Sequence, residues 1–186
     1  MLTVNKLIPQ GRGLAAVLLK RAPTVELDWD LRQKSRFEAA DSAGRSLGVF
    51  LARGSVVRGG DVLVADDGSL VRVIAAPQPV LRVTACPEHG TLRDLPRAAY
   101  HLGNRHVALE VQADHLQIEP DPVLAGMLRG MHLIVTEMQA AFEPEGGAYD
   151  SQGHDHAHHG HAHDHDHEHG HGHAHGHEHG HHDEPR

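Results

Sequence analysis

The chain has 186 residues and a formal net charge of −8 at pH 7, and almost all of that charge lies at one end. From Asp150 onward there are eight acidic residues and one base, whereas the preceding body holds 16 basic and 17 acidic residues. A nearly neutral body excludes the basic surface of a nucleic-acid binder. The single cysteine, Cys86, excludes an internal disulfide and fits a reducing compartment. The start has no signal-peptide pattern and no apolar run can span a bilayer, so we expect a soluble, cytoplasmic protein without a membrane partner.

Histidine recurs at nearly every second position near the C-terminus, where 16 of the 21 histidines lie. These residues are His154, His156, His158, His159, His161, His163, His165, His167, His169, His171, His173, His175, His177, His179, His181 and His182. Neutral imidazole is the most common protein metal ligand, and imidazoles spaced by Asp, Glu, Gly and Ala cannot bury a core. Residues 150–186 are therefore predicted to be a disordered, multidentate metal-binding tail. The tail does not identify its metal, since affinity order alone favours copper over nickel and zinc.

The first part of the chain, residues 1–76, has the pattern of a β-rich domain. Six short segments rich in β-branched residues are separated by turn signals, and an Asp-Gly turn joins the last two. The expected strands are 2–4, 24–27, 36–39, 47–51, 61–64 and 70–74. Several short strands without helices predict a small barrel or sandwich. The Arg58–Asp61 segment predicts a turn, because a phosphate loop would need a lysine and a following helix.

After a linker at Pro77-Gln78-Pro79 the pattern changes. The expected elements are a strand at 80–85, a helix at 95–102 capped by Asp94, strands at 106–111 and 115–118, a helix opened by Asp121-Pro122, and a strand at 133–136. This β-α-β-β-α-β order is ferredoxin-like. An extended arm rich in Gly, Pro and Glu follows at 142–149. The sequence thus predicts an α+β protein with domains at 1–76 and 77–149 and the disordered tail at 150–186.

The segment Tyr100–His106, with the sequence YHLGNRH, connects the first expected helix to its strand. We expect Gly103-Asn104 to end the helix in a left-handed turn, Arg105 to hold nearby carbonyls or a carboxylate, and His106 to begin the strand. The segment resembles the helix-to-strand motif of the UreE family of urease accessory proteins, which are nickel metallochaperones. Glu143–Tyr149 resembles the arm of that family and Arg58–Leu63 its N-terminal domain, so the resemblance covers the whole chain.

The resemblance implies a cytoplasmic Ni²⁺ carrier rather than an enzyme, with Zn²⁺ and Cu²⁺ as competitors. It implies a homodimer in which His106 of each protomer shares one metal ion, with further ligands from the tails, because two imidazoles under-fill a nickel site. Nickel would pass by ligand exchange to a maturation complex of an accessory GTPase and apo-urease. The first domain would bind a peptide or a partner protein. The sequence itself shows no nucleophile–base constellation that would favour catalysis.

One stretch departs from the family. Many members carry an H-x-H arrangement after the hairpin, where this chain has Glu119–Pro122. Asp121 is explained by its role as a helix cap, and a carboxylate ligand role stays open. Of the other body residues, we expect His101 to be packed, Cys86 to be a small buried hydrophobe, His115 and His132 to lie at the surface, and His89 to offer a weak metal contact.

Two alternative functions fit the same sequence. The first is a metal store or buffer, in which the tail holds ions and no dedicated client exists. The second is a peptide-binding chaperone module, in which metal only controls dimerisation. Transfer of nickel to apo-urease separates the carrier from the store, and removal of residues 150–186 separates the carrier from the peptide binder.

Overall fold

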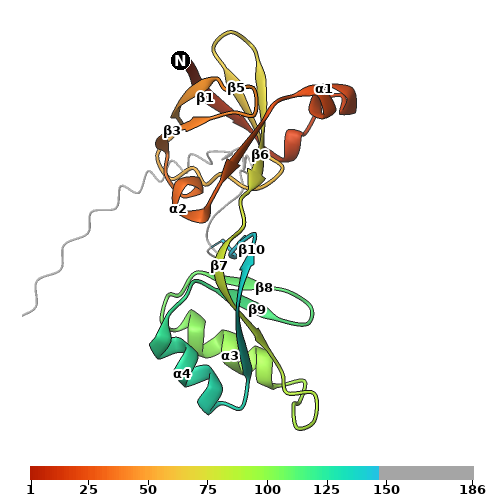
Figure 1. Cartoon of the computed structure of the whole chain (residues 1–186), viewed down its shortest axis with the longest axis vertical. Coiled ribbons are helices and arrows are strands. Elements are labelled where there is room, and N and C mark those ends of the chain that lie inside the picture. Colours follow the sequence, from red (N-terminus) through yellow and green to blue (C-terminus); the bar gives the residue numbers. More distant parts are fainter. Residues whose placement is uncertain (147–186) are drawn as a thin grey trace, which may run out of the picture. The chain divides into compact units, whose positions relative to one another are not determined.

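The computed structural model describes residues 1–146, which contain two β-sheets (Figure 1). The predicted end of the arm and the predicted disordered, histidine-rich tail lie outside the described residues. No helix within residues 1–146 is long and apolar enough to cross a membrane.

The first sheet has six strands in the order β2-β6-β5-β1-β4-β3. Its elements are β1 (Leu2–Ile8), a 3-10 turn (Pro9–Gly11), α1 (Ala16–Arg21), β2 (Thr24–Leu27), α2 (Trp29–Arg32), β3 (Arg36–Ala40), β4 (Ser46–Phe50), β5 (Val62–Ala65) and β6 (Leu70–Ala75). The six strands were predicted from short segments rich in β-branched residues between turn signals. The expectation of a domain without helices is wrong, because α1 and α2 occur. The side chain of Asp28 accepts a hydrogen bond from the Leu31 N–H at 2.9 Å and so caps α2.

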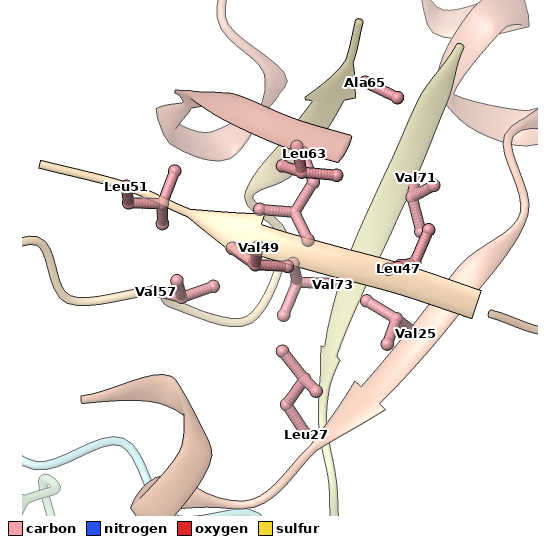
Figure 2. Packing of buried hydrophobic residues seen from close by; sticks show 11 residues of the cluster. Val25, Leu27, Leu47, Val49, Leu51, Val57, Leu63, Ala65, Val71 and Val73 are labelled. Carbon is pink, nitrogen blue, oxygen red and sulfur yellow. The ribbon is translucent and has the colours of Figure 1, made fainter. Parts of the chain in front are cut away.

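The core of this sheet consists of aliphatic side chains that alternate along the strands. Val25, Leu47, Val49 and Val73 are at most 1% exposed, and Figure 2 shows them pointing into one cluster. The strands of this sheet have four to seven residues, and each places at most two fully buried side chains in this core, so no single strand builds it alone. Burial of each such side chain stabilises the fold by about 1.5–3 kcal/mol.

The second sheet is antiparallel, with the strand order β10-β7-β9-β8. Its elements are β7 (Gln78–Thr84), α3 (Asp94–Gly103), β8 (Leu109–Val111), β9 (Leu116–Ile118), α4 (Pro122–Gly130) and β10 (Ile134–Ala140). Both helices lie on one face of this sheet (Figure 1). Ala98 and Leu102 of α3 and Leu128 of α4 pack there against Leu81 and Ile118. The elements follow the predicted β-α-β-β-α-β order.

Several local predictions in this half are wrong. Gln78 and Pro79 belong to β7 and pair with β10, so they are not a linker. Pro79 is tolerated because β7 pairs with β9 only at Leu81–Val83, which leaves its other edge open at the proline. Asp94 is the first residue of α3 rather than its cap, and its carboxylate accepts hydrogen bonds from the N–H and hydroxyl of Thr91.

Asp121 caps α4, as predicted. Its Oδ1 accepts hydrogen bonds from the N–H groups of Val123 at 2.7 Å and Leu124 at 2.8 Å, and Pro122 occupies the first helical position. These bonds satisfy two of the donors that a helix leaves unpaired at its start.

If Asp121 acts as a cap and not as a ligand, Asp121→Ala lowers the free energy of unfolding of the metal-free protein by about 1 kcal/mol. Asp121→Asn, which keeps a side-chain acceptor, changes the stability by only a few tenths of that amount. Urea unfolding measures both variants. Loss of a bound nickel ion in Asp121→Asn would instead identify the carboxylate as a ligand.

Candidate functional site

The turn that ends α3 holds His106 in a left-handed backbone conformation with φ of 55°. The His106 N–H donates to the Gly103 carbonyl at 2.9 Å, and the Val107 N–H donates to the Leu102 carbonyl at 3.3 Å. This pair of bonds defines a Schellman motif, in which glycine usually occupies the left-handed position. A histidine there costs about 1 kcal/mol relative to an ordinary backbone conformation. The observation is a reason to look for function at His106.

His106 therefore occupies the left-handed position of the turn, whereas we expected it to begin the following strand. Gly103 is the last helical residue and Asn104 has φ of −62°, so neither is left-handed, and β8 begins only at Leu109. The register of the turn is set by Val107, which packs against the core that contains the buried Leu102. Arg105 donates to the His101 carbonyl at 2.9 Å, as predicted, and closes the end of the helix. His106 is left exposed to solvent.

His132 has the same geometry at the end of α4. Its φ is 63°, its N–H donates to the Arg129 carbonyl at 3.0 Å, and the Leu133 N–H donates to the Leu128 carbonyl at 3.2 Å. His132 is also exposed, as predicted. Both sites share the pattern Leu-x-x-x-His-apolar, a sequence signal that none of the predictions used. The structure thus supplies a matched pair of histidines that differ in their surroundings and not in their backbone.

The described residues do not complete a metal site around His106. Within residues 1–146, no three His, Cys, Asp or Glu side chains are grouped so that they can hold a metal ion. His101 is half-buried, and its ring lies edge-to-face with Tyr100 at 5.4 Å. His115 is not a free surface residue: its side chain is 15% exposed, and its Nδ1 lies 2.6 Å from Asp114 Oδ1. That contact lowers the pKa of Asp114 below its usual value. The tail histidines lie outside the described residues.

Cys86 is not a buried hydrophobe, which corrects the prediction. It is only half-buried, and its Sγ lies 3.8 Å from Nδ1 of the exposed His89. Hydrogen bonds from the backbone of His89 and, to a smaller extent, from its side chain lower the pKa of the Cys86 thiol, because they stabilise the thiolate. In the described chain His89 thus contacts a sulfur atom.

A second polar centre was not expected from the sequence. The side chain of Arg32 is fully buried, and its Nη1 forms an ion pair with Glu143 Oε1 at 2.9 Å. Its Nε donates to the Leu27 carbonyl at 3.0 Å and its Nη2 to the Phe142 carbonyl. Burial lowers the pKa of the Arg32 guanidinium, an effect that the carboxylate of Glu143 opposes. A guanidinium stays charged in proteins, so the buried charge of Arg32 must be stabilised by its ion-pair and hydrogen-bond partners.

Comparison with known proteins gives the relatives of the chain. The families described as UreE urease accessory protein, N-terminal domain and C-terminal domain, match residues 4–76 and 78–169. A urease accessory protein UreE of Paracidovorax citrulli is 76% identical over 154 residues, which are 83% of this chain and 73% of the relative. Those of Albidiferax ferrireducens and Ralstonia nicotianae are 73% and 52% identical, over 88% and 73% of their own lengths.

The chain belongs to the UreE family of urease accessory proteins. The resemblance that rested on the Tyr100–His106 motif is thereby confirmed. The family assists the maturation of urease, and it is a family of accessory chaperones rather than of enzymes. The matched families cover both described sheets.

Because glycine is the residue that favours a left-handed helix end, His106→Gly and His132→Gly should each raise the free energy of unfolding by about 0.5–1 kcal/mol. His106→Ala and His132→Ala keep the strain and should bring no such gain. Urea unfolding of the metal-free variants measures the effect. A loss of stability in His106→Gly would show that the ring itself is packed, against the exposed position described above.

Proposed function

We propose that this UreE protein is a nickel metallochaperone that delivers Ni²⁺ for assembly of the urease active site. The observation that carries the proposal is the exposed His106, which a specific family motif holds in a strained turn. The 16 histidines near the C-terminus supply the capacity to collect the ion. Its relatives are named urease accessory proteins, which supports urease as the client.

The working site needs more than one chain. A single exposed imidazole cannot hold nickel, and the described residues offer His106 no ligand set. A homodimer with His106 of each protomer facing a two-fold axis would supply two imidazoles from one position. We assign this dimer to the second domain, which we classify as ferredoxin-like, with the further ligands from the histidine-rich segment. Zn²⁺ and Cu²⁺ compete because imidazole binds all three ions.

Transfer proceeds by ligand exchange. Nickel collected on the histidine-rich segment passes to the His106 pair and then to a cytoplasmic complex of an accessory GTPase and apo-urease. The first domain serves partner docking: Val17 and Leu18 of α1 and Phe50 of β4 are about half exposed and offer apolar contacts. Storage without a client is the second candidate, favoured by the abundance of tail histidines against one motif-borne histidine in the body.

Removal of residues 150–186 should take away most of the bound nickel and leave about one ion per dimer, because the His106 pair remains. Equilibrium dialysis of the two chains gives the stoichiometry. Full stoichiometry in the shortened chain would place the capacity in the body instead.

Nickel affinity should fall as the pH drops through about 6.5, where free imidazole becomes protonated. The sign follows from the ligand: only the neutral ring has a free lone pair for the metal, so protons and nickel compete. Calorimetric titrations at pH 7.5 and at pH 6.0, in buffers of known proton enthalpy, measure the difference. An affinity that does not change between them would indicate carboxylate ligands.

Delivery should depend on His106 far more than total binding does. His106→Ala removes both imidazoles of the shared site at once, whereas the tail keeps bulk uptake nearly constant. His132→Ala is the matched control, because it removes an equally exposed ring from the same backbone geometry. Urease activation at limiting nickel should fall at least tenfold in His106→Ala and stay unchanged in His132→Ala.

Sedimentation of both variants controls for the dimer, whose contact would be protein surface and not metal. Normal activation by His106→Ala at limiting nickel would contradict delivery through His106. Uptake without any transfer to apo-urease, by the unaltered protein, would favour the storage function.

A further inference from the structure

The outer edge of β10 is the least protected strand edge in the described part of the chain. β10 (Ile134–Ala140) pairs with β7 through all seven residues without a register shift, and no described strand pairs with its other side. It contains no proline and one charged residue, Glu137. Natural proteins usually protect such an edge with a bulge, a proline, charges or a covering segment, because its free N–H and C=O groups can pair with another chain.

The other edges of the two described sheets are protected in these ways. β8 has only three residues, and the Leu109 carbonyl accepts a hydrogen bond from the Glu145 N–H at 2.8 Å, so the segment after β10 covers it. β2 has four residues, and its Thr24 carbonyl accepts a hydrogen bond from the Ser42 N–H at 2.7 Å. β3 carries two charges among its five residues. The long and regular edge of β10 is therefore the exception, and binding of another chain would explain it.

The side chains of β10 are available to an added strand. Most of them are exposed to solvent: Ile134, Thr136, Glu137, Met138 and Gln139. Ile134 and Met138 are 43% and 37% exposed although both are large and apolar. They share one face with Thr136, since side chains alternate along a strand. A neighbouring strand would cover this apolar strip and pair with the backbone at the same time.

A shallow hollow of about 230 Å³ adjoins this edge, and it indicates the charge of the occupant. The residues that line it come from β7, β10 and the turn before α4: Pro79, Val80, Pro120, Glu137, Met138 and Gln139. Within residues 1–146 the carboxylate of Glu137 forms no ion pair. A lysine or arginine side chain fits here, with its aliphatic stem on the prolines and its charge near Glu137.

We propose that the outer edge of β10 binds an extended, basic segment of a partner protein, which adds to the second sheet as a further strand. Backbone hydrogen bonds supply the affinity, and the carboxylate of Glu137 selects a basic residue opposite it. A second copy of β10 is a poorer occupant. If two copies paired over the full strand about a two-fold axis, the two Glu137 side chains would face each other, and like charges directly opposite destabilise a strand pair. This docking role does not depend on nickel delivery.

The proposal is tested in the metal-free full-length protein with a synthetic peptide as the probe. The peptide alternates threonine and valine around one central lysine and is long enough to pair with all seven residues of β10. At saturating peptide, the amides of residues 134–140 that point away from β7 should exchange with deuterium at least tenfold more slowly. Unchanged exchange of these amides, or slower exchange only elsewhere in the chain, would overturn the proposal.

Backbone methylation separates strand addition from binding by side chains alone. A peptide with the same side chains but with methylated backbone nitrogens on both sides cannot donate hydrogen bonds to β10. It should bind the unaltered protein at least tenfold more weakly than the unmethylated probe. Equal affinity would show that the backbone is not used and would overturn strand addition.

A charge exchange at Glu137 tests the basic character of the occupant. The unaltered protein should bind the lysine peptide about fivefold more tightly than the same peptide with a central glutamate, and Glu137→Lys should reverse this preference. Glu38→Lys makes the same charge change at an exposed position of the edge strand β3 and should leave the preference as it is. It thereby controls for attraction by the net charge of −8. An equal shift in both variants would overturn the basic occupant.

Hydrogen exchange of the free protein at several concentrations decides whether a second copy occupies the edge. Fast exchange of the outward-facing β10 amides at every concentration supports an edge that is open to a partner. Exchange that is slow without peptide, and slower still as the protein concentration rises, would show that the edge pairs with another copy of this chain. That result would overturn the proposal.

Discussion

A buried guanidinium joins two parts of the described chain that are far apart in sequence. Arg32 lies at the end of a four-residue helix, and its carboxylate partner Glu143 lies 111 residues later. Removal of one partner of such a pair costs about 3–5 kcal/mol, because the remaining charge stays buried without compensation. The helix α2, beside the first sheet, is therefore stabilised by Glu143, a residue that follows the last strand of the second sheet.

The other constraint on the structure lies at the C-terminal ends of α3 and α4, the two helices that pack on the second sheet. Val107 and Leu133 are apolar residues that must reach the core, and each reaches it through a preceding residue in the left-handed conformation. In both turns that residue is histidine rather than glycine, at a cost of about 1 kcal/mol. The two turns have the same backbone geometry, and only His106 lies in the family motif. We therefore base the proposed metal role of His106 on its surroundings and not on the conformation of the turn. The difference between the two histidines matters for function because members of the UreE family assist urease maturation.

The strands of the first sheet could be predicted because each is a short segment between local turn signals, and Thr24–Leu27 also shows alternating burial. The helices α1 and α2 could not, since four to six residues are too short to display a helical period. Pro79 suggested a linker because proline cannot donate to a ladder, and only the strand order shows that its edge is open there.

Prediction of the local structure around the candidate site succeeded in part for similar reasons. The motif identified the turn after α3, but the left-handed residue was assigned to Gly103-Asn104 by residue preference, whereas packing of Val107 places it at His106. Arg32 gave no signal at all, because a charged residue in a short helix has the pattern of a solvated one and its partner is remote in sequence. Asp121 was identified as a cap because both of its partners are local.

The central claim is that His106, and not the equivalent His132, receives nickel in the folded body of the protein. The most direct test follows the paramagnetic broadening of the histidine ring resonances in the full-length protein. Ni²⁺ is added until the tail histidines are saturated. The account predicts that the His106 ring broadens while the His132 ring stays sharp. Equal broadening of both rings, or broadening of neither, would contradict it.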